Sequence, residues 1–343
     1  MSQSQKLNLK PLVARILKIL SDRNGSILAL RHGVEGGSKN TLENVGKKYG
    51  ITRERVRQIE EASYDKIRNS NEFNELGPAF ATIENFLKQY GGVSTEEKLM
   101  NTLVPSSQKP HLSLLLALNK NFVKIQESDD FKTIWATDKK SANTIKNMLT
   151  SLISSVEKLG TPLDYKQLLE LVEDDNSLEL NNQNLPVVLS ISKKLQKGPF
   201  NKWGLSNWPQ INPRGVRDKA HLVMERHGQP LHFKQLAIKI DEYLGTGADT
   251  KKTHPQTAHN KLIKDDRFVL IGRGTYALAD WGYVPGTVKD VIIHILQKEG
   301  KPMRRDELMK RVMEQRKVQE NTIALNLQNK ELFRKQENQY YLT

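Results

Sequence analysis

The stretch TLENVGKKYGITRERVRQIEEASYDKIR, residues 41–68, decides how the first part of this chain folds. Apolar residues recur at helical spacing on both sides of Gly50, and a glycine can adopt the left-handed backbone that a sharp turn between two helices needs. Thr41 and Thr52 stand where the N-caps of these two helices are expected. The stretch therefore predicts a helix-turn-helix.

The second helix of this pair carries planar, hydrogen-bonding side chains along one face. We expect Val56, Ile59 and Ser63 on its buried side, and the opposite side spans an arc of roughly 140°. The residues on that arc are Arg53, Glu54, Arg57, Gln58 and Glu61. In the DNA major groove, Arg pairs with guanine, Gln pairs with adenine, and Glu accepts from cytosine. The pattern therefore predicts a helix that reads base edges in the major groove.

Further side chains are expected at the phosphates beside this helix. Arg55 lies to one side of the arc, and Lys47 and Lys48 close the preceding helix. The expected DNA-binding residues are Thr41, Lys47, Lys48, Arg53, Glu54, Arg55, Arg57 and Gln58. An ordinary amphipathic helix with a solvated charged face is the alternative interpretation.

Residues 11–70 as a whole resemble region 4 of housekeeping-type bacterial sigma factors, and TRERVRQIE at residues 52–60 is the most specific part. In that family the region is a helix-turn-helix that binds the −35 promoter element and packs against the flap of the RNA polymerase β subunit. The resemblance implies DNA contacts from the second helix. It implies that Arg53, Glu54 and Gln58 contact bases. It implies that Arg55 and Arg57 contact bases or phosphates.

The chain departs from that family in two places. Asn24-Gly25 stands where the family has charged helix formers, which favours a shorter or frayed helix on the flap side of the region. Only a short segment precedes residue 11, which leaves no room for a promoter-melting region. We therefore expect a sigma-like promoter-reading region rather than a complete sigma factor.

Beyond Phe80 the chain repeats itself four times, each time with a glycine followed eight positions later by a leucine. The pairs are Gly91/Leu99, Gly160/Leu168, Gly228/Leu236 and Gly300/Leu308. The glycines lie 69, 68 and 72 residues apart, a spacing that approaches the size of a small domain. This period predicts an array of small domains rather than a thin solenoid.

Each repeat has the pattern of three helices followed by a pair of short strands, such as 122–125 with 133–135. This order predicts a winged helix. The expected fold class is mainly α, with a sigma region 4-like helix-turn-helix followed by four tandem winged-helix domains with small β-hairpin wings. The expected domains, each with a core of its own, are residues 1–75, 76–139, 140–212, 213–284 and 285–343.

Residues 214–284 resemble HARE-type helix-turn-helix domains, as in the RNA polymerase delta subunit, on the stretches RHGQPLHFKQLAIKI and DDRFVLIGRGTYALADWG. The resemblance is weaker in the last repeat and weakest in the first two. It implies a winged helix in a nucleic-acid or transcription setting. The residues suspected of secondary nucleic-acid contacts are Lys251, Lys252, Lys261 and Arg273. Because winged helices also serve as protein-docking modules, that alternative stays open.

The composition agrees with a polyanionic partner. The chain has 343 residues, with 53 Lys and Arg against 39 Asp and Glu, and a net charge of +14. It has no cysteine, which excludes disulfides, thiolate nucleophiles and cysteine-ligated zinc. His254 and His259 are interpreted as surface histidines, so neither a metal nor a cofactor is expected. Since no apolar run approaches the ~18 residues of a membrane span, we expect a cytoplasmic, nucleoid-associated protein without a membrane partner.

Three classes of function are considered. The first is a non-enzymatic, DNA-binding bacterial transcription factor, with double-stranded promoter-like DNA and the β-subunit flap of core RNA polymerase as partners. The second is a polymerase-associated scaffold with little DNA contact. The third is a nuclease, suggested by the E-x-K spacing of Glu96 and Lys98, although no Pro-Asp partner precedes them. We expect the first class, and no enzyme.

Overall fold

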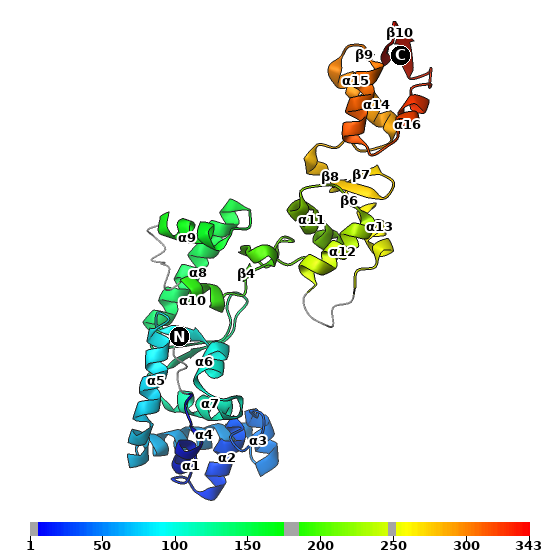
Figure 1. The fold of residues 1–343 in the computed structure, drawn as a ribbon. Helices are drawn as coiled ribbons and strands as arrows, with labels where there is room; N and C mark the ends of the chain where they lie inside the picture. Colours follow the sequence, from blue (N-terminus) through cyan, green and yellow to red (C-terminus); the bar gives the residue numbers. More distant parts are fainter. Residues whose placement is uncertain (1–5, 175–184, 246–251) are drawn as a thin grey trace. The chain divides into compact units, whose positions relative to one another are not determined.

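The computed structural model describes residues 6–174, 185–245 and 252–343 (Figure 1). The chain divides into two compact units, Met1–Asn207 and Trp208–Thr343. Lys251, one of the suspected nucleic-acid contacts, lies outside the described residues.

The first unit begins with the helix-turn-helix region. Its helices are α1 (Lys10–Leu17), α2 (Asp22–His32), α3 (Leu42–Tyr49) and α4 (Arg53–Arg68). In the turn between α3 and α4, Gly50 adopts the left-handed conformation with φ at 67°, as expected. A Cβ at Gly46 would lie 2.6 Å from the carbonyl oxygen of Ile51, so only glycine allows α3 to approach the turn this closely. The predicted helix-turn-helix is confirmed.

Helix α2 is regular throughout, so the expected shortening at Asn24-Gly25 is wrong. Ser21 caps its N-terminus by accepting a hydrogen bond from the amide of Asn24 at 3.4 Å, and Gly33 ends the helix with φ at 75°. Gly25 is buried, and a Cβ there would lie 3.3 Å from the carbonyl oxygen of Leu17. The glycine is a poor helix former, but it lets α2 pack closely against the end of α1.

The first repeat follows with three helices and a small sheet. Its elements are η1 (Asn71–Leu76), α5 (Gly77–Lys88), β1 (Val93–Thr95), α6 (Glu96–Leu103), η2 (Ser106–Gln108), α7 (Lys109–Leu118), β2 (Val123–Ile125) and β3 (Ile134–Ala136). The strand pair expected from the sequence is β2–β3, with Lys124 opposite Trp135. Strand β1 was not expected. It pairs with β3, so the antiparallel sheet has the order β1-β3-β2.

One hydrophobic core runs through the helix-turn-helix region and the first repeat. Apolar side chains of α1, α2 and the end of α4 pack together with those of α5, α6 and α7. Its fully buried members include Val13, Leu28, Ile67, Leu87 and Leu115. The expectation that residues 1–75 have a core of their own is therefore wrong. The physical reason is the Leu-rich α7, whose buried side chains need apolar neighbours on more than one side.

Polar contacts join the same two parts of the first unit. The guanidinium of Arg68, at the end of α4, donates to the carbonyl oxygens of Leu118 and Ala117 at 2.7 and 3.1 Å. A cation is favourable at this position because the last carbonyls of α7 have no partner within the helix. At the other end of the region, the amide of Leu9 donates to the side chain of Gln108 at 2.6 Å. Both ends of the region are thus bonded to the first repeat.

The second repeat completes the first unit. Its elements are α8 (Lys139–Leu159), α9 (Tyr165–Asp174), α10 (Leu185–Ile191), β4 (Leu195–Lys197), η4 (Pro199–Asn201) and β5 (Trp203–Leu205). Strands β4 and β5 pair antiparallel, and Leu163 forms a β-bridge to Trp203 beside them. The amide of Lys132 in the first repeat donates to the carbonyl of Ile191 at 2.9 Å, so the two repeats are in direct contact.

The second unit contains the third and fourth repeats. Its elements are α11 (Val216–His227), β6 (Leu231–His232), α12 (Phe233–Leu244), α13 (Pro255–Leu262), β7 (Phe268–Gly272), β8 (Thr275–Leu278), η5 (Ala279–Trp281), α14 (Val288–Glu299), β9 (Met303–Arg304), α15 (Arg305–Gln315), α16 (Glu320–Asn326), β10 (Phe333–Gln336) and β11 (Gln339–Leu342). The sheets have the orders β6-β8-β7 and β10-β11-β9. One hydrophobic core contains Leu236 and Tyr276, and a separate one contains Leu308 and Phe333.

Arg316 connects these two cores. Its side chain is buried, and its guanidinium donates to the carbonyl oxygens of Leu270, Val284 and Gly286, the last two at 2.7 and 2.6 Å. The next amide along the chain, that of Lys317, donates to β7 at 2.8 Å. A buried guanidinium needs such acceptors, because an unpaired buried charge is costly. The third and fourth repeats are therefore bonded to each other through backbone carbonyls.

Three of the four repeated glycines end helices. Gly160, Gly228 and Gly300 follow α8, α11 and α14 in the left-handed conformation, with φ of 67°, 72° and 64°. The repeated leucines are fully buried, and they are Leu99, Leu168, Leu236 and Leu308. The period of the sequence thus records one core position in every repeat and a helix end in the last three.

Leu28→Ala should lower the free energy of unfolding of the first unit by about 2–5 kcal/mol, because the change leaves a cavity in the shared core. Amide hydrogen exchange should then accelerate in α1, α2 and α7 together. The control is Leu325→Ala in the second unit, where the side chain is 65% exposed. Faster exchange in α1 and α2 with α7 unaffected would contradict a shared core.

Candidate nucleic-acid interface

The exposed face of α4 lies where the sequence predicted it. Val56 and Ser63 are buried, and Ile59 is half-buried against a small cluster formed by Ile27, Val45 and Val56. This cluster fixes α4 against α2 and α3. The predicted arc on the other side is exposed, and it consists of Arg53, Glu54, Arg57, Gln58 and Glu61.

Threonine caps begin both helices of the pair. The Thr41 hydroxyl oxygen accepts a hydrogen bond from the amide of Asn44 at 3.1 Å, and the Thr52 hydroxyl oxygen accepts one from the amide of Arg55 at 3.1 Å. Both caps are exposed, so each marks a helix N-terminus that faces the surroundings. Thr41 was expected among the DNA-binding residues, and its side chain is placed by this cap.

Arg57 is held by two carboxylates of its own helix. Its Nη2 lies 2.7 Å from Oε1 of Glu54, and its Nη1 lies 2.6 Å from Oε1 of Glu61. The hydrogen bonds from Arg57 lower the pKa of the Glu54 carboxyl. Because all three side chains are exposed to water, these pairs contribute little to stability and can be exchanged for other partners.

Arg53 and Gln58 are placed differently from Arg57. The Oε1 of Gln58 accepts a hydrogen bond from Nη1 of Arg55 at 3.1 Å. The side chain of Arg53, the first residue of α4, forms no hydrogen bond or ion pair with any residue that the structure describes. Its guanidinium therefore has all its donors available for a ligand.

Two lysines lie at the end of α3, and one of them, Lys47, borders the same hollow as Arg53. The Nζ of Lys47 lies 2.8 Å from Oε1 of Glu43 one turn earlier, and Lys48 is exposed. Lys47, Glu43 and Arg53 border a hollow of about 420 Å³ at the turn between the two helices. The end of α3 and the start of α4 thus form one cationic surface around this turn, with Glu43 as its acidic member.

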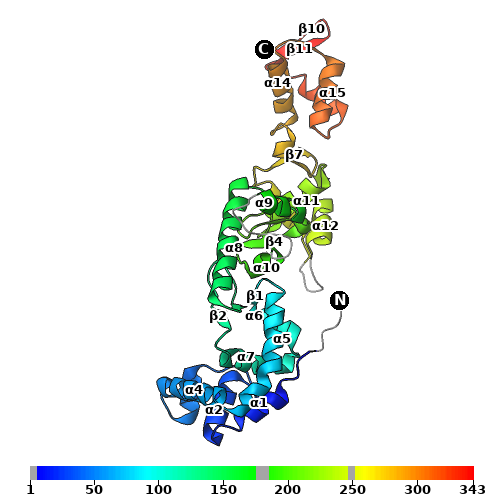
Figure 2. The same ribbon diagram turned by 90° about the vertical axis from the view of Figure 1, so that its left-hand side faces the viewer.

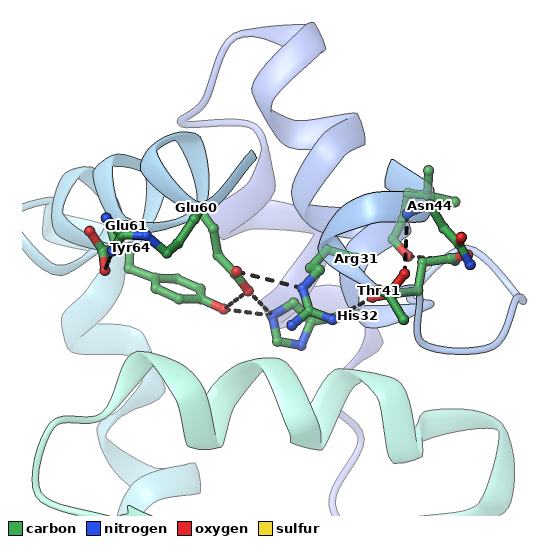
Figure 3. Close-up of polar contacts among 10 residues, drawn as sticks. Arg31, His32, Thr41, Asn44, Glu60, Glu61 and Tyr64 are labelled. Carbon is green, nitrogen blue, oxygen red and sulfur yellow. Dashed lines mark hydrogen bonds and ion pairs between the residues drawn. The ribbon is translucent and has the colours of Figure 1, made fainter. Parts of the chain in front are cut away.

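A buried polar cluster joins α2 to α4 behind this surface (Figure 3). The Nε2 of His32 lies 2.7 Å from the hydroxyl oxygen of Tyr64, which donates to Oε1 of Glu60 at 2.8 Å. The Nε of Arg31 lies 3.5 Å from the other carboxylate oxygen of Glu60. The side chain of His32 is only 3% exposed. These contacts hold the middle of α4 against the end of α2.

The protonation states in this cluster follow from burial and charge. Burial lowers the pKa of His32, although the carboxylate of Glu60 opposes this effect. Burial also favours a raised pKa for Glu60, but the hydrogen bonds from His32 and Tyr64 and the charge of Arg31 outweigh it, so the pKa of Glu60 is lowered. Glu60 is therefore the charged member of the cluster near neutral pH, and His32 is neutral.

No contact between the residues of this cluster was predicted from the sequence. The available signal was local: Glu60 and Tyr64 are four residues apart, so they share a face of α4 beside the buried Val56 and Ile67. Their partner His32 lies in another helix, and helical spacing carries no information about a contact between two helices.

Three of the suspected contacts in the second unit are exposed. They are Lys252, Lys261 in α13 and Arg273 at the turn between β7 and β8. His259 in the same repeat is bonded to the core, since its Nδ1 lies 3.0 Å from the hydroxyl oxygen of Tyr276. Within the described ranges, no group of three or more His, Asp or Glu is placed to hold a metal ion.

Glu96 and Lys98, the E-x-K pair, have separate structural partners. Oε1 of Glu96 lies 2.7 Å from Nζ of Lys124 and accepts a hydrogen bond from the indole of Trp135 at 3.2 Å. The ammonium of Lys98 lies 3.5 Å from the ring centroid of Tyr90. Both contacts are internal to the first repeat.

None of the helices in the described part of the chain has the length and apolar character needed to cross a membrane.

Comparison with known proteins identifies two helix-turn-helix families along the chain. The family model of sigma-70 region 4 matches residues 16–69, and that of the HARE-HTH domain, a helix-turn-helix domain of ASXL and restriction endonuclease proteins, matches residues 215–281. The RNA polymerase sigma factor SigA of Listeria monocytogenes serovar 1/2a is 41% identical over 68 residues, which is 20% of this chain and 18% of that protein. SigA of Listeria innocua serovar 6a matches with the same values.

The match to the curated relatives is confined to one module, since it spans under a fifth of their length. Both resemblances stated from the sequence are confirmed, and so is a mainly helical fold that combines a sigma region 4 helix-turn-helix with a HARE-type winged helix. The two modules support a DNA-binding, transcription-associated protein, and they are non-catalytic types.

Acidification from pH 7.5 to 5.5 should destabilise the first unit, and His32→Gln should remove part of this loss. The unfolded chain binds a proton at His32 near its ordinary pKa of about 6.5, whereas burial lowers that pKa in the folded protein. Stability is therefore full above this pH and falls below it. Because the folded pKa of Glu60 is lowered, its protonation adds a further loss below about pH 4.3.

Urea unfolding at each pH measures this effect. His294→Gln, at an exposed position in the second unit, is the matched control. An equal loss of stability on acidification in the parent chain and in His32→Gln would show that the cluster does not carry the pH dependence.

Proposed function

We propose that α4 enters the major groove of duplex DNA and reads a −35-type element. The observation that carries this proposal is the exposed arc of Arg, Gln and Glu on a helix whose opposite side is fixed in two hydrophobic clusters. Arg53 and Gln58 are the proposed base readers, because their side chains match guanine and adenine bidentately. The similarity of residues 16–69 to sigma-70 region 4 supports the same assignment.

The ion pairs on α4 are proposed to exchange when DNA binds. Arg57 would leave Glu54 for a base or a phosphate, and Glu54 would then be free to accept from cytosine. Arg55 would move from Gln58 to a phosphate, which frees the Gln58 amide for adenine. On an unmatched sequence, Glu54 and Glu61 would face phosphates or base acceptors without a donor. The carboxylates therefore add discrimination, because they are repelled where no partner is present.

The phosphate contacts are proposed at the ends of α3. Lys47 and Lys48 lie at its C-terminus, next to the turn that leads into α4. Thr41 caps its N-terminus, where free amides favour a phosphate. These contacts position the helix without reading sequence.

The four repeats are proposed to be winged helices with the domain boundaries expected from the sequence. Each combines helices with a small sheet in the described residues, and the third matches the HARE-type family. Lys252, Lys261 and Arg273 are proposed to add secondary nucleic-acid contacts. Since one module alone offers few contacts, the repeats would hold the chain on DNA while α4 reads it.

Core RNA polymerase is the second proposed partner, from the resemblance to a sigma factor region. Docking on the β flap would use the apolar surface of the module rather than its charged arc. In this structure Leu28 and Ile67 on that side are packed against the first repeat. This burial leaves less apolar surface for flap docking, on which the scaffold alternative depends entirely, so it favours DNA contact over a scaffold. We also propose that the protein acts at the nucleoid, in the cytoplasm.

Arg53→Ala should weaken the preference for a −35-type duplex over a scrambled duplex by about 1–3 kcal/mol, because one bidentate base contact is lost. Lys47→Ala should weaken both duplexes alike and reduce the salt slope by about one unit. Fluorescence anisotropy with the full chain and core polymerase measures both effects. Arg23→Ala is the matched control, since Arg23 is exposed on α2, away from the arc.

For the proposal to hold, Arg53→Ala must change sequence preference, and Lys47→Ala must change the affinity for all sequences alike. If matched and scrambled duplexes bind equally, and Arg53→Ala changes neither, α4 does not read sequence.

A further inference from the structure

A basic and aromatic groove lies against the last hairpin of the second unit, far along the chain from α4. Its volume is about 520 Å³, and none of its lining residues is acidic. Lys330, Arg334 and Lys335 supply the cations, and Tyr340 and Tyr341 supply aromatic rings. Figure 2 shows β10 and β11, which carry four of these residues, beside α14.

The strand register distributes these side chains over both faces of the hairpin. Arg334 stands opposite Tyr341, and Lys335 stands opposite Tyr340. Directly opposed residues share a face of a sheet, so each ring has a cation beside it. The ammonium of Lys335 lies 5.9 Å from the ring centroid of Tyr340. The cations are exposed and the rings are half-buried, so both remain accessible to a ligand.

The hairpin is anchored, so the groove has a defined shape. Its buried Phe333 belongs to the core of the fourth repeat, and β11 also pairs with β9. Glu337 and Asn338 form the turn with φ of 47° and 63°, the left-handed pair that a two-residue hairpin turn requires. Glu337 and Glu331 flank the groove along the chain without lining it.

None of the three cations forms an ion pair with a residue that the structure describes. On α4, by contrast, Arg57 at the centre of the arc is paired with two carboxylates. Exposed cations without an internal ion pair can bind an anionic partner from outside the chain. The rings offer a stacking surface to a partner with flat, apolar faces.

We propose that this groove binds single-stranded DNA. Bases would stack on the exposed part of Tyr341 beside Arg334, and Lys330 and Lys335 would hold further phosphates where the strand passes around the edge strand β10. Every base has a π-face and every nucleotide a negative charge. A duplex would present only its backbone to the rings, since its bases are already stacked. The site is thus separate from α4, and it gives this DNA-binding chain a second contact that forms only where the strands are apart.

The proposal is tested by fluorescence anisotropy of the full chain with a labelled 12-mer of thymidine. Tyr341→Ala should weaken binding about tenfold, whereas Tyr341→Phe, which keeps the ring, should bind like the parent chain. Lys330→Ala with Lys335→Ala should reduce the salt slope by about 1.4 units. The matched control is Lys298→Ala with Lys301→Ala, two exposed lysines of the same repeat outside the groove, which should leave the slope unchanged.

Two further variants distinguish a loss of binding from a loss of folding, and this site from the site on α4. If Tyr341→Ala lowers the melting temperature of the second unit, Arg334→Glu at an exposed position replaces it and should also weaken binding strongly. Arg53→Ala should leave binding of the 12-mer unchanged, so failure of this site and failure of the duplex site are distinguishable. Unchanged binding in both Tyr341→Ala and Arg334→Glu overturns the proposal. If these variants weaken binding of duplex DNA equally, or if the chain prefers a uridine 12-mer of RNA, the assignment to single-stranded DNA is wrong.

Discussion

The burial of α7 between the helix-turn-helix region and the rest of the first repeat is the constraint on which the first unit depends. Its leucines are shared by both parts, and Arg68 at the end of α4 bonds to its last carbonyls. A small helix-turn-helix region has limited apolar surface to bury by itself. The first repeat supplies the rest, so the orientation of α4 is set by residues that lie up to 50 positions further along the chain.

Because of that constraint, α4 has a back that is fixed by packing and a front whose ion pairs can be exchanged. On the back, Val56 and Ile67 are fully buried and Glu60 is held in a polar cluster with His32 and Tyr64. On the front, Arg57 is paired only with carboxylates of its own helix, and Arg53 has no such partner among the described residues. A helix that reads DNA needs both properties, because the contacts must be placed accurately and the intrahelical pairs must be replaceable. The apolar side of the sigma-like region is, in this chain, used for internal packing.

The parts of this structure that could be predicted are those that local sequence determines. The turn at Gly50, the exposed arc of α4 and the helix ends at Gly160, Gly228 and Gly300 all follow from spacing within a few residues. The shared core could not be predicted, since the leucines of α7 indicate burial without saying against what. The same holds for Arg316 and for the His32–Glu60 contact, whose partners lie in other elements. Strands β1, β6 and β9 were not predicted, since their two or three residues lie directly before a helix and carry no strand partner nearby in the sequence.

The proposed function rests on a contact between Arg53 on α4 and guanine in the major groove of a −35-type element. Methylation of guanine N7 blocks that contact without changing the phosphates or the minor groove. If Arg53 makes this contact, duplexes methylated at one guanine of the element will be excluded from the complex of the full chain with core polymerase. This exclusion should disappear in Arg53→Ala and persist in Lys47→Ala. Binding by the parent chain that is indifferent to guanine N7 methylation at every position would contradict the proposed contact.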